Sequence, residues 1–121
     1  MNKQNNHYQL YINGKWVTGS EGQVIHSLNP HNNQTWASFD CASKEDVDIA
    51  VKAAKNALDQ PSWKSIAASD RGKLLYKLAD LIEENAENIG RIETLDSGKL
   101  LAETVSQTKY VSEYYLSLIH I

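Results

Sequence analysis

The hydrophobic period of this chain changes once, and this change constrains the possible folds more than any other feature. Residues 8–39 show strand-like behaviour, whereas from Ser43 onward apolar residues recur at three- and four-residue steps. Strands favour a period of two residues and helices a period of 3.6. With 121 residues there is room for one domain and a modest core. We therefore predict an α+β fold, with an N-terminal β ribbon followed by three amphipathic helices.

The β-prone part opens with a predicted hairpin. Two runs rich in aromatic and branched residues, 8–12 and 15–17, flank the pair Asn13-Gly14. An Asn-Gly pair between such runs is a strong hairpin signal, because both central positions of the turn favour positive φ. The two runs are therefore predicted to pair with each other.

Two further strands are predicted before the helical part. One covers residues 23–28 and ends at Asn29-Pro30, because proline cannot donate a hydrogen bond to a strand ladder. The other is a short strand over residues 35–39. Together with the hairpin, these segments make up the predicted β ribbon.

The first predicted helix starts at Ser43 and stops at Gln60-Pro61. Ser43 occupies the N-cap position, and Glu45 and Asp46 place negative charge on the exposed amides of the first turn. Its apolar residues recur at helical spacing along one face: Val47, Ala50, Val51, Ala54 and Leu58.

Two more helices follow, separated by Gly98, which is a suitable C-terminal breaker. The second helix begins near Ser69-Asp70, and its stripe consists of Leu74, Leu75, Leu78, Leu81, Ile82, Ile89 and Ile92. The third carries Leu101, Val105, Val111, Tyr115 and Leu118. No parallel sheet is predicted for these wide apolar faces to cover. We therefore predict that the chain lacks its packing partner, because a helix stripe must bury against something.

Composition narrows the classes of function. A formal net charge of −3 predicts no attraction to nucleic acid or to an anionic membrane. No apolar run approaches the roughly 20 residues needed to span a bilayer, and the N-terminus lacks the apolar stretch of a signal peptide. A single cysteine allows no internal disulfide, which fits a reducing compartment. The chain is predicted to be cytoplasmic.

No catalytic group emerges from the residues themselves. Cys41 is the only thiol, and it lies before the first helix with only Lys44 nearby to favour its thiolate, so we interpret it as structural. The four histidines lack the paired spacing of a zinc site. The chain has neither a phosphate-binding loop nor a Gly-x-Gly-x-x-Gly motif. We therefore assign no catalytic residue.

Five stretches, in order and at matching spacing, resemble the NAD(P)-dependent aldehyde dehydrogenases. They are similar to an opening strand at residues 10–17, an Asn-Pro turn at 27–30, a first helix at 45–54, a second helix at 71–85 and the turn after it at 93–99, which reads Glu-Thr-Leu-Asp-Ser-Gly-Lys. No single stretch is specific, but five in register over residues 8–115 are hard to obtain by chance. On this resemblance we identify the chain as a member of the family.

The resemblance implies a Rossmann-like α/β fold, of which residues 1–121 form the N-terminal portion of the cofactor-binding domain. Family members are several times longer, use NAD or NADP, assemble as homodimers or homotetramers, and oxidise an aldehyde to a carboxylic acid through a cysteine thioester. Their catalytic and dinucleotide-binding residues lie beyond the matched stretch. No catalytic or cofactor-binding residue is therefore assigned, and this chain alone is expected to be inactive. The identity of the aldehyde and the choice between NAD and NADP stay open.

One site implied by the resemblance falls within the matched region. Some family members bind a monovalent cation through backbone carbonyls before the Asn-Pro turn and an aspartate in the later turn. These positions correspond to Ser27, Leu28 and Asp96. Oxygen ligands suit a hard cation, and carbonyl ligands tolerate a change of side chain. The alternative, which we favour, is that Asp96 caps the turn after the second helix.

The end of the chain departs from the family pattern after Tyr115, so residues 116–121 are either native or a tail that is foreign to the family. We therefore assign no role to His120. Two classes of function remain open. The chain is either a part of an aldehyde dehydrogenase without activity of its own, or a stand-alone helical interaction module or regulator. An open apolar stripe from Leu74 to Ile92 is expected for the first class, and a closed surface for the second.

Overall fold

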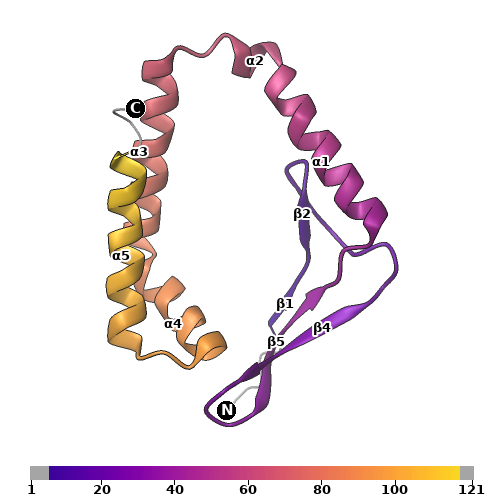
Figure 1. Ribbon diagram of the computed structural model, residues 1–121, viewed down its shortest axis with the longest axis vertical. Helices are drawn as coiled ribbons and strands as arrows, with labels where there is room; N and C mark the ends of the chain where they lie inside the picture. Colours follow the sequence, from indigo (N-terminus) through magenta and orange to yellow (C-terminus); the bar gives the residue numbers. More distant parts are fainter. Residues whose placement is uncertain (1–5, 118–121) are drawn as a thin grey trace. The chain divides into compact units, whose positions relative to one another are not determined.

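The computed structural model describes residues 6–117 and divides into two compact units, Met1–Ser65 and Ile66–Ile121, here unit 1 and unit 2. The described part of unit 1 holds strands β1 to β5 and helices α1 and α2, and that of unit 2 holds helices α3 to α5 (Figure 1). The fold is α+β, with strands before helices as predicted.

The predicted hairpin is confirmed. Strands β2 (Leu10–Ile12) and β3 (Lys15–Val17) pair antiparallel in one two-stranded sheet. The two-residue turn between them has φ of 53° at Asn13 and 76° at Gly14. Both values lie in the left-handed region, which asparagine and glycine tolerate better than other residues.

The run predicted as one strand over residues 8–12 is two strands in different sheets. Its beginning belongs to β1 (Asn6–Tyr8), which pairs in parallel with β5 (Gln34–Asp40). Tyr8 lies opposite Phe39, and their rings stack with centroids 5.5 Å apart. This partner lies more than 30 residues further along the chain, so the periodicity of the run itself does not reveal the break.

The larger sheet has the strand order β1-β5-β4. β4 (Val24–Asn29) pairs antiparallel with β5 and ends directly before Pro30, as predicted. Their register shifts between Ser27 and Leu28, which marks a β-bulge. β4 is therefore an edge strand with an irregularity at its centre.

Helix α1 (Lys44–Asp59) begins at the predicted cap. The Ser43 side chain accepts a hydrogen bond from the Asp46 N–H, and the Asp46 side chain accepts one from the Ser43 N–H, which completes a capping box. The helix stops at Gln60, as predicted. A short helix that was not predicted, α2 (Pro61–Lys64), follows at once, since proline suits the first helical position.

The helix predicted from about residue 69 to Gly98 is two helices. α3 (Ala68–Glu84) and α4 (Ala86–Ser97) are separated by Asn85, whose φ of −100° and ψ of 9° leave the helical region. The Asn85 side-chain Nδ2 donates to the Leu81 carbonyl at 2.8 Å, so a polar side chain takes part in ending the helix. Gly98 ends α4 with φ of 76°, as predicted.

Helix α5 (Leu101–Ser117) buries a different face from the one predicted. Its buried side chains are Thr104, Thr108 and Ser112. The predicted stripe is exposed or half-buried at Leu101, Val105, Val111 and Tyr115, and Leu118 lies outside the described residues. The cause lies on α4, where a Cβ on Gly90 would meet a side-chain carbon of Val105 at 2.7 Å and its backbone nitrogen at 2.8 Å. Helices that approach so closely leave room at their contact only for small side chains.

The described residues have little apolar core. The buried hydrophobic residues among them are the alanines Ala37, Ala79 and Ala86. The accessible surface of 9395 Å² exceeds the roughly 7,900 Å² expected even for two separate compact units of half the mass. Leu74 is 50% exposed and Ile92 is 38% exposed, so the predicted stripe between them is open.

Candidate functional site

Ser27 and Leu28 lie at the bulge of β4. The Ser27 hydroxyl accepts a hydrogen bond from the Trp36 indole N–H at 3.1 Å, which holds this part of the edge strand against β5. An edge strand directs every second carbonyl away from its ladder, and a bulge changes which carbonyls these are.

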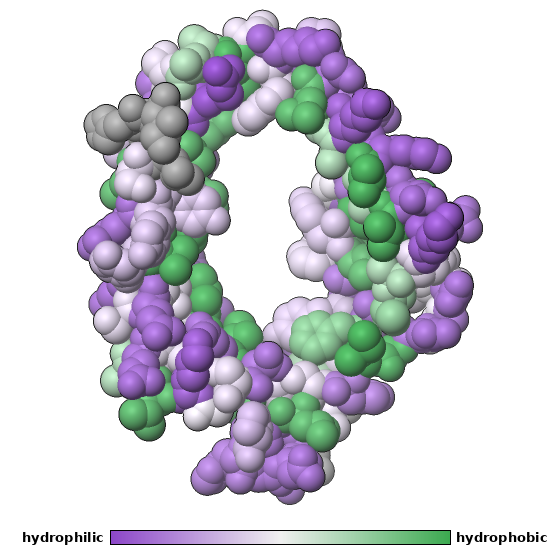
Figure 2. Space-filling model, in the orientation of Figure 1, coloured by the Kyte–Doolittle hydropathy of each residue, from purple (hydrophilic) through white to green (hydrophobic). Residues whose placement is uncertain are grey.

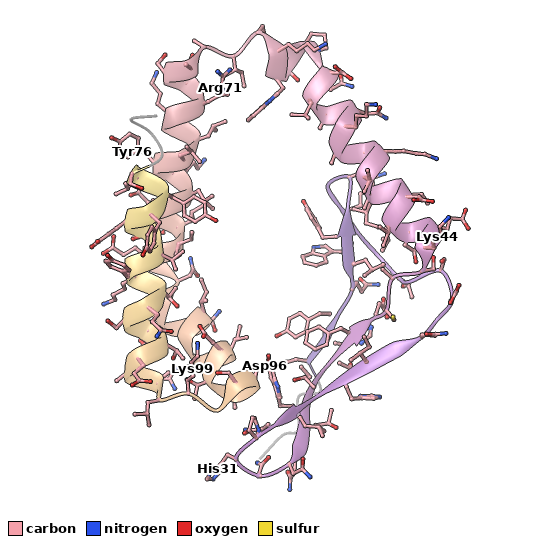
Figure 3. The ribbon with its side chains drawn as sticks, in the orientation of Figure 1. His31, Lys44, Arg71, Tyr76, Asp96 and Lys99 are labelled. Atoms are coloured by element: carbon pink, nitrogen blue, oxygen red, sulfur yellow. The ribbon has the colours of Figure 1, made fainter. Side chains whose placement is uncertain are left out.

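Asp96 lies in the last turn of α4, and Figure 3 shows it with Lys99 at that end of the helix. The Ser97 hydroxyl donates to the Glu93 carbonyl at 2.7 Å and accepts from the Lys99 N–H at 3.3 Å. Lys99 also forms an ion pair with Glu93, with 2.6 Å between Nζ and Oε1. The C-terminal end of a helix carries partial negative charge, so a carboxylate here adds to a potential that attracts cations.

The three predicted cation ligands are divided between the units. Ser27 and Leu28 belong to unit 1 and Asp96 belongs to unit 2. Their oxygen chemistry fits a hard cation, and the site stays a prediction. Within residues 6–117 there is no group of three or more His, Cys, Asp or Glu side chains that could hold a metal ion.

A buried carboxylate that sequence reasoning treated only as a helix-end charge organises unit 1. Asp46 Oδ2 accepts hydrogen bonds from the Ser20 N–H at 3.0 Å, the Ser20 hydroxyl at 3.0 Å and the Ser43 N–H at 2.9 Å. The backbone N–H of Ser20, followed by that of Ser43, lowers the pKa of Asp46 to about 2. The spacing from Ser43 to Asp46 signals the cap, whereas nothing local in the sequence signals the bond to Ser20.

A second buried carboxylate, Asp40 at the end of β5, was not singled out from the sequence. It accepts a hydrogen bond from the Gly19 N–H at 3.3 Å and faces His7 Nε2 at 3.1 Å. The other ring nitrogen of His7 lies 2.9 Å from the Ser38 hydroxyl. Asp40 and Asp46 thus fasten the segment at Gly19 and Ser20 to the sheet and to α1. These groups hold the chain in place and offer no open reaction centre.

Cys41 is half-buried, and its thiol lies 4.0 Å from the carbonyl of Ala42. No base or cation contacts the sulfur in the part of the chain that the structure describes. Among residues 6–117, no helix has the length and hydropathy to cross a bilayer.

Comparison with known sequences decides the family. The sequence profile described as "Aldehyde dehydrogenase family" matches residues 16–119. The chain belongs to the aldehyde dehydrogenase family. The resemblance of the five stretches is thereby confirmed.

Curated relatives agree with this assignment. The chain is 47% identical over 108 residues to the (Z)-2-((N-methylformamido)methylene)-5-hydroxybutyrolactone dehydrogenase of Acinetobacter baylyi, covering 89% of this chain and 22% of that protein. It is 46% identical over 91 residues to the mitochondrial 10-formyltetrahydrofolate dehydrogenase of Mus musculus, covering 75% of this chain and 10% of that protein. The chain thus spans less than a quarter of the length of these relatives.

Solved aldehyde dehydrogenase structures share the fold. An NAD-dependent aldehyde dehydrogenase from Sinorhizobium meliloti matches with a TM-score of 0.90 at 28% identity, covering 98% of this chain and 24% of that one. The betaine aldehyde dehydrogenase of Staphylococcus aureus in complex with NAD⁺ matches with a TM-score of 0.88 at 30% identity, covering 98% and 23%. The strands and helices described above are therefore a recurring part of aldehyde dehydrogenase structures.

Proposed function

We propose that this chain is the N-terminal portion of the cofactor-binding domain of an NAD(P)-dependent aldehyde dehydrogenase. The whole enzyme would oxidise an aldehyde to a carboxylic acid through a cysteine thioester. The observation that carries the proposal is the family match over residues 16–119. The NAD-dependent S. meliloti enzyme and the NAD⁺ complex of the S. aureus enzyme support a nicotinamide cofactor.

Within such an enzyme the chain's role is structural. Asp46 and Asp40 fix the N-terminal ribbon and the start of α1, and Thr104 fixes α5 against α4. We propose that these groups act on the fold and not on the substrate, and we assign no NAD(P) contact to residues 1–121. We also propose that the whole enzyme is cytoplasmic and forms a homodimer or homotetramer. It is proposed to bind neither nucleic acid nor a membrane.

The proposal is tested with a hybrid enzyme in which this chain replaces the matched segment of the A. baylyi dehydrogenase. We expect the hybrid to reduce NAD with the relative's own substrate, because at 47% identity the replacement keeps the same packing pattern. The isolated chain, as its control, is expected to reduce none. A soluble hybrid without activity, or an active isolated chain that Cys41→Ala inactivates, would contradict the proposal.

The proposal also includes a monovalent cation held by the carbonyls of Ser27 and Leu28 and the carboxylate of Asp96. Asp96→Asn separates this role from capping, because asparagine retains a hydrogen-bond acceptor at the turn but loses the charge. We expect the variant to lose the extra heat stability that K⁺ or Na⁺ gives the hybrid over a bulky organic cation. Asp80→Asn, an exposed change on α3, serves as the control. An equal cation response in both variants would leave Asp96 as a cap alone.

A further inference from the structure

The turn between β2 and β3 holds the only asparagine-glycine pair of the sequence, Asn13-Gly14. Both residues are exposed, and both have a left-handed φ. Apart from the neighbouring residues, no atom lies within 4 Å of the place that a Cβ on Gly14 would take. We propose that Asn13 is a site of spontaneous covalent modification, at which attack by the Gly14 backbone nitrogen converts the asparagine to aspartate and isoaspartate.

The modification needs only water as a co-reactant. The Gly14 nitrogen gives its proton to solvent and forms a bond to Cγ of Asn13, while the side-chain nitrogen takes up a solvent proton and leaves as ammonia. The product is a succinimide ring, which water then opens. Cleavage of the new bond to Cγ gives aspartate, whereas cleavage at the backbone carbonyl of Asn13 gives isoaspartate, whose main chain passes through Cγ. The overall change is a hydrolysis that oxidises and reduces nothing, and both products carry one additional carboxylate.

Asn33 shows why the following residue decides the outcome. It is exposed and has a φ of 56°, close to the 53° of Asn13. The nitrogen that would attack it belongs to Gln34, which carries a side chain and donates to the Asn32 Oδ1 at 3.0 Å. Among the described residues no acceptor pairs with the Gly14 N–H, and glycine has no side chain to hinder the attack. The two asparagines thus share a conformation and differ in the freedom of the attacking nitrogen.

The hairpin that carries Asn13 is weakly held. β2 and β3 are three-residue strands that form a sheet of two strands, and such a ribbon is marginally stable by itself. Tyr11 and Trp16, opposite each other in this ribbon, are 61% and 64% exposed. Figure 2 shows hydrophobic residues beside hydrophilic ones at the surface of unit 1. Local opening therefore costs little free energy, and it frees the Gly14 nitrogen to approach Cγ.

The test follows the full chain during prolonged incubation in neutral buffer, by tryptic peptide mapping and mass spectrometry. The peptide that ends at Lys15 is expected to gain the mass that accompanies exchange of an amide for a carboxylic acid, and to separate into an aspartate and an isoaspartate form. We expect Asn13 to convert within about ten-fold of its rate in the urea-unfolded chain, and Asn33 at least about ten-fold more slowly than Asn13.

Asn13→Gly is the matched control, because glycine tolerates the left-handed turn and has no amide to convert. In this variant the peptide that ends at Lys15 should keep its mass. A mass gain that persists there would place the reaction at another amide and overturn the proposal. Conversion of Asn13 in urea but not in the folded chain would mean that the turn protects it, which would also overturn the proposal. Equal conversion of Asn13 and Asn33 would do the same, because the free Gly14 nitrogen would then have no effect.

Discussion

The two units differ in the buried polar groups that hold them together, which are carboxylates in unit 1 and hydroxyls in unit 2. In unit 1 the carboxylates of Asp40 and Asp46 accept hydrogen bonds from backbone segments more than 20 residues away. In unit 2 the Thr104 hydroxyl is fully buried and lies 2.9 Å from both the Gly90 carbonyl and the Thr94 hydroxyl. Unit 1 is therefore joined by charge-assisted bonds, and unit 2 by close steric fit between helices.

This difference predicts that the stability of unit 2 depends more than that of unit 1 on contacts with surrounding polypeptide. Directional bonds hold unit 1 together even though its apolar side chains are largely exposed. The helices of unit 2 meet through glycine, alanine and hydroxyl groups, and their leucines and isoleucines remain open.

The units are distinguishable in experiments, because the three tryptophans all lie in unit 1, at Trp16, Trp36 and Trp63. Tryptophan fluorescence therefore reports on unit 1, and most of the helical circular dichroism reports on unit 2.

The largest effect is expected for Gly90→Ala. Its Cβ would meet the Val105 backbone nitrogen at 2.8 Å, and backbone atoms of a packed helix cannot move aside independently. We expect unit 2 to lose about 3 kcal/mol of unfolding free energy, despite the better helix propensity of alanine. Urea unfolding followed by circular dichroism measures the loss. Asn88→Ala, on the exposed side of α4, is the control, and equal stability of the two variants would show that the helices do not depend on this close approach.

A smaller loss is expected for Thr104→Val, which keeps the shape of the side chain and removes the hydroxyl. The buried Gly90 carbonyl and Thr94 hydroxyl then lose a partner, at a cost of about 2 kcal/mol to unit 2. Thr104→Ser retains the hydroxyl and should recover part of the loss. If Thr104→Val is as stable as the wild-type chain, the hydrogen bonds of the Thr104 hydroxyl are not what distinguishes unit 2 from unit 1.

Ser43→Ala addresses unit 1 in the same way. It removes the side-chain cap on the Asp46 N–H and a 2.7 Å contact with the Ser20 hydroxyl. We expect a loss of about 1 kcal/mol, the usual cost of an N-cap. The loss should appear in tryptophan fluorescence while the helical signal of unit 2 is unchanged. A simultaneous change in both signals would mean that the two units unfold as one and would break the comparison.

Local signals in the sequence predicted the features that local chemistry determines. The Asn13-Gly14 turn, the Ser43 cap and the Gly98 stop were all found where they were expected. Each depends on the conformational or hydrogen-bonding preference of the residues at that position. These preferences act within a few residues, so a single sequence reveals them.

Features set by distant partners were missed. The break after Tyr8 depends on a stack with Phe39, and the buried face of α5 depends on the close approach at Gly90. Helical periodicity favoured the larger apolar residues for that face, whereas the space at the contact admits only small ones. For the candidate site, Ser27, Leu28 and Asp96 came from the family resemblance alone. Asp40 and Ser20, which form buried contacts within unit 1, carry no local motif that would have identified them.

The smallest effect concerns Asp46, whose contribution to stability is present at neutral pH and is lost on acidification. Its pKa is lowered from 3.8 to about 2 by hydrogen bonds to the Ser20 and Ser43 N–H groups, so the folded state favours the ionised carboxylate. The resulting stability is fully present above about pH 4 and is lost as the pH falls from there towards 2. The free energy of unfolding of the wild-type chain and of Asp46→Asn is measured by tryptophan fluorescence between pH 6 and about pH 2. Plotted against pH, the two free energies should converge on acidification. Parallel curves would mean that Asp46 contributes no charge-dependent stability, and the contrast between a unit held by carboxylates and a unit held by hydroxyls would then rest on Asp40 alone.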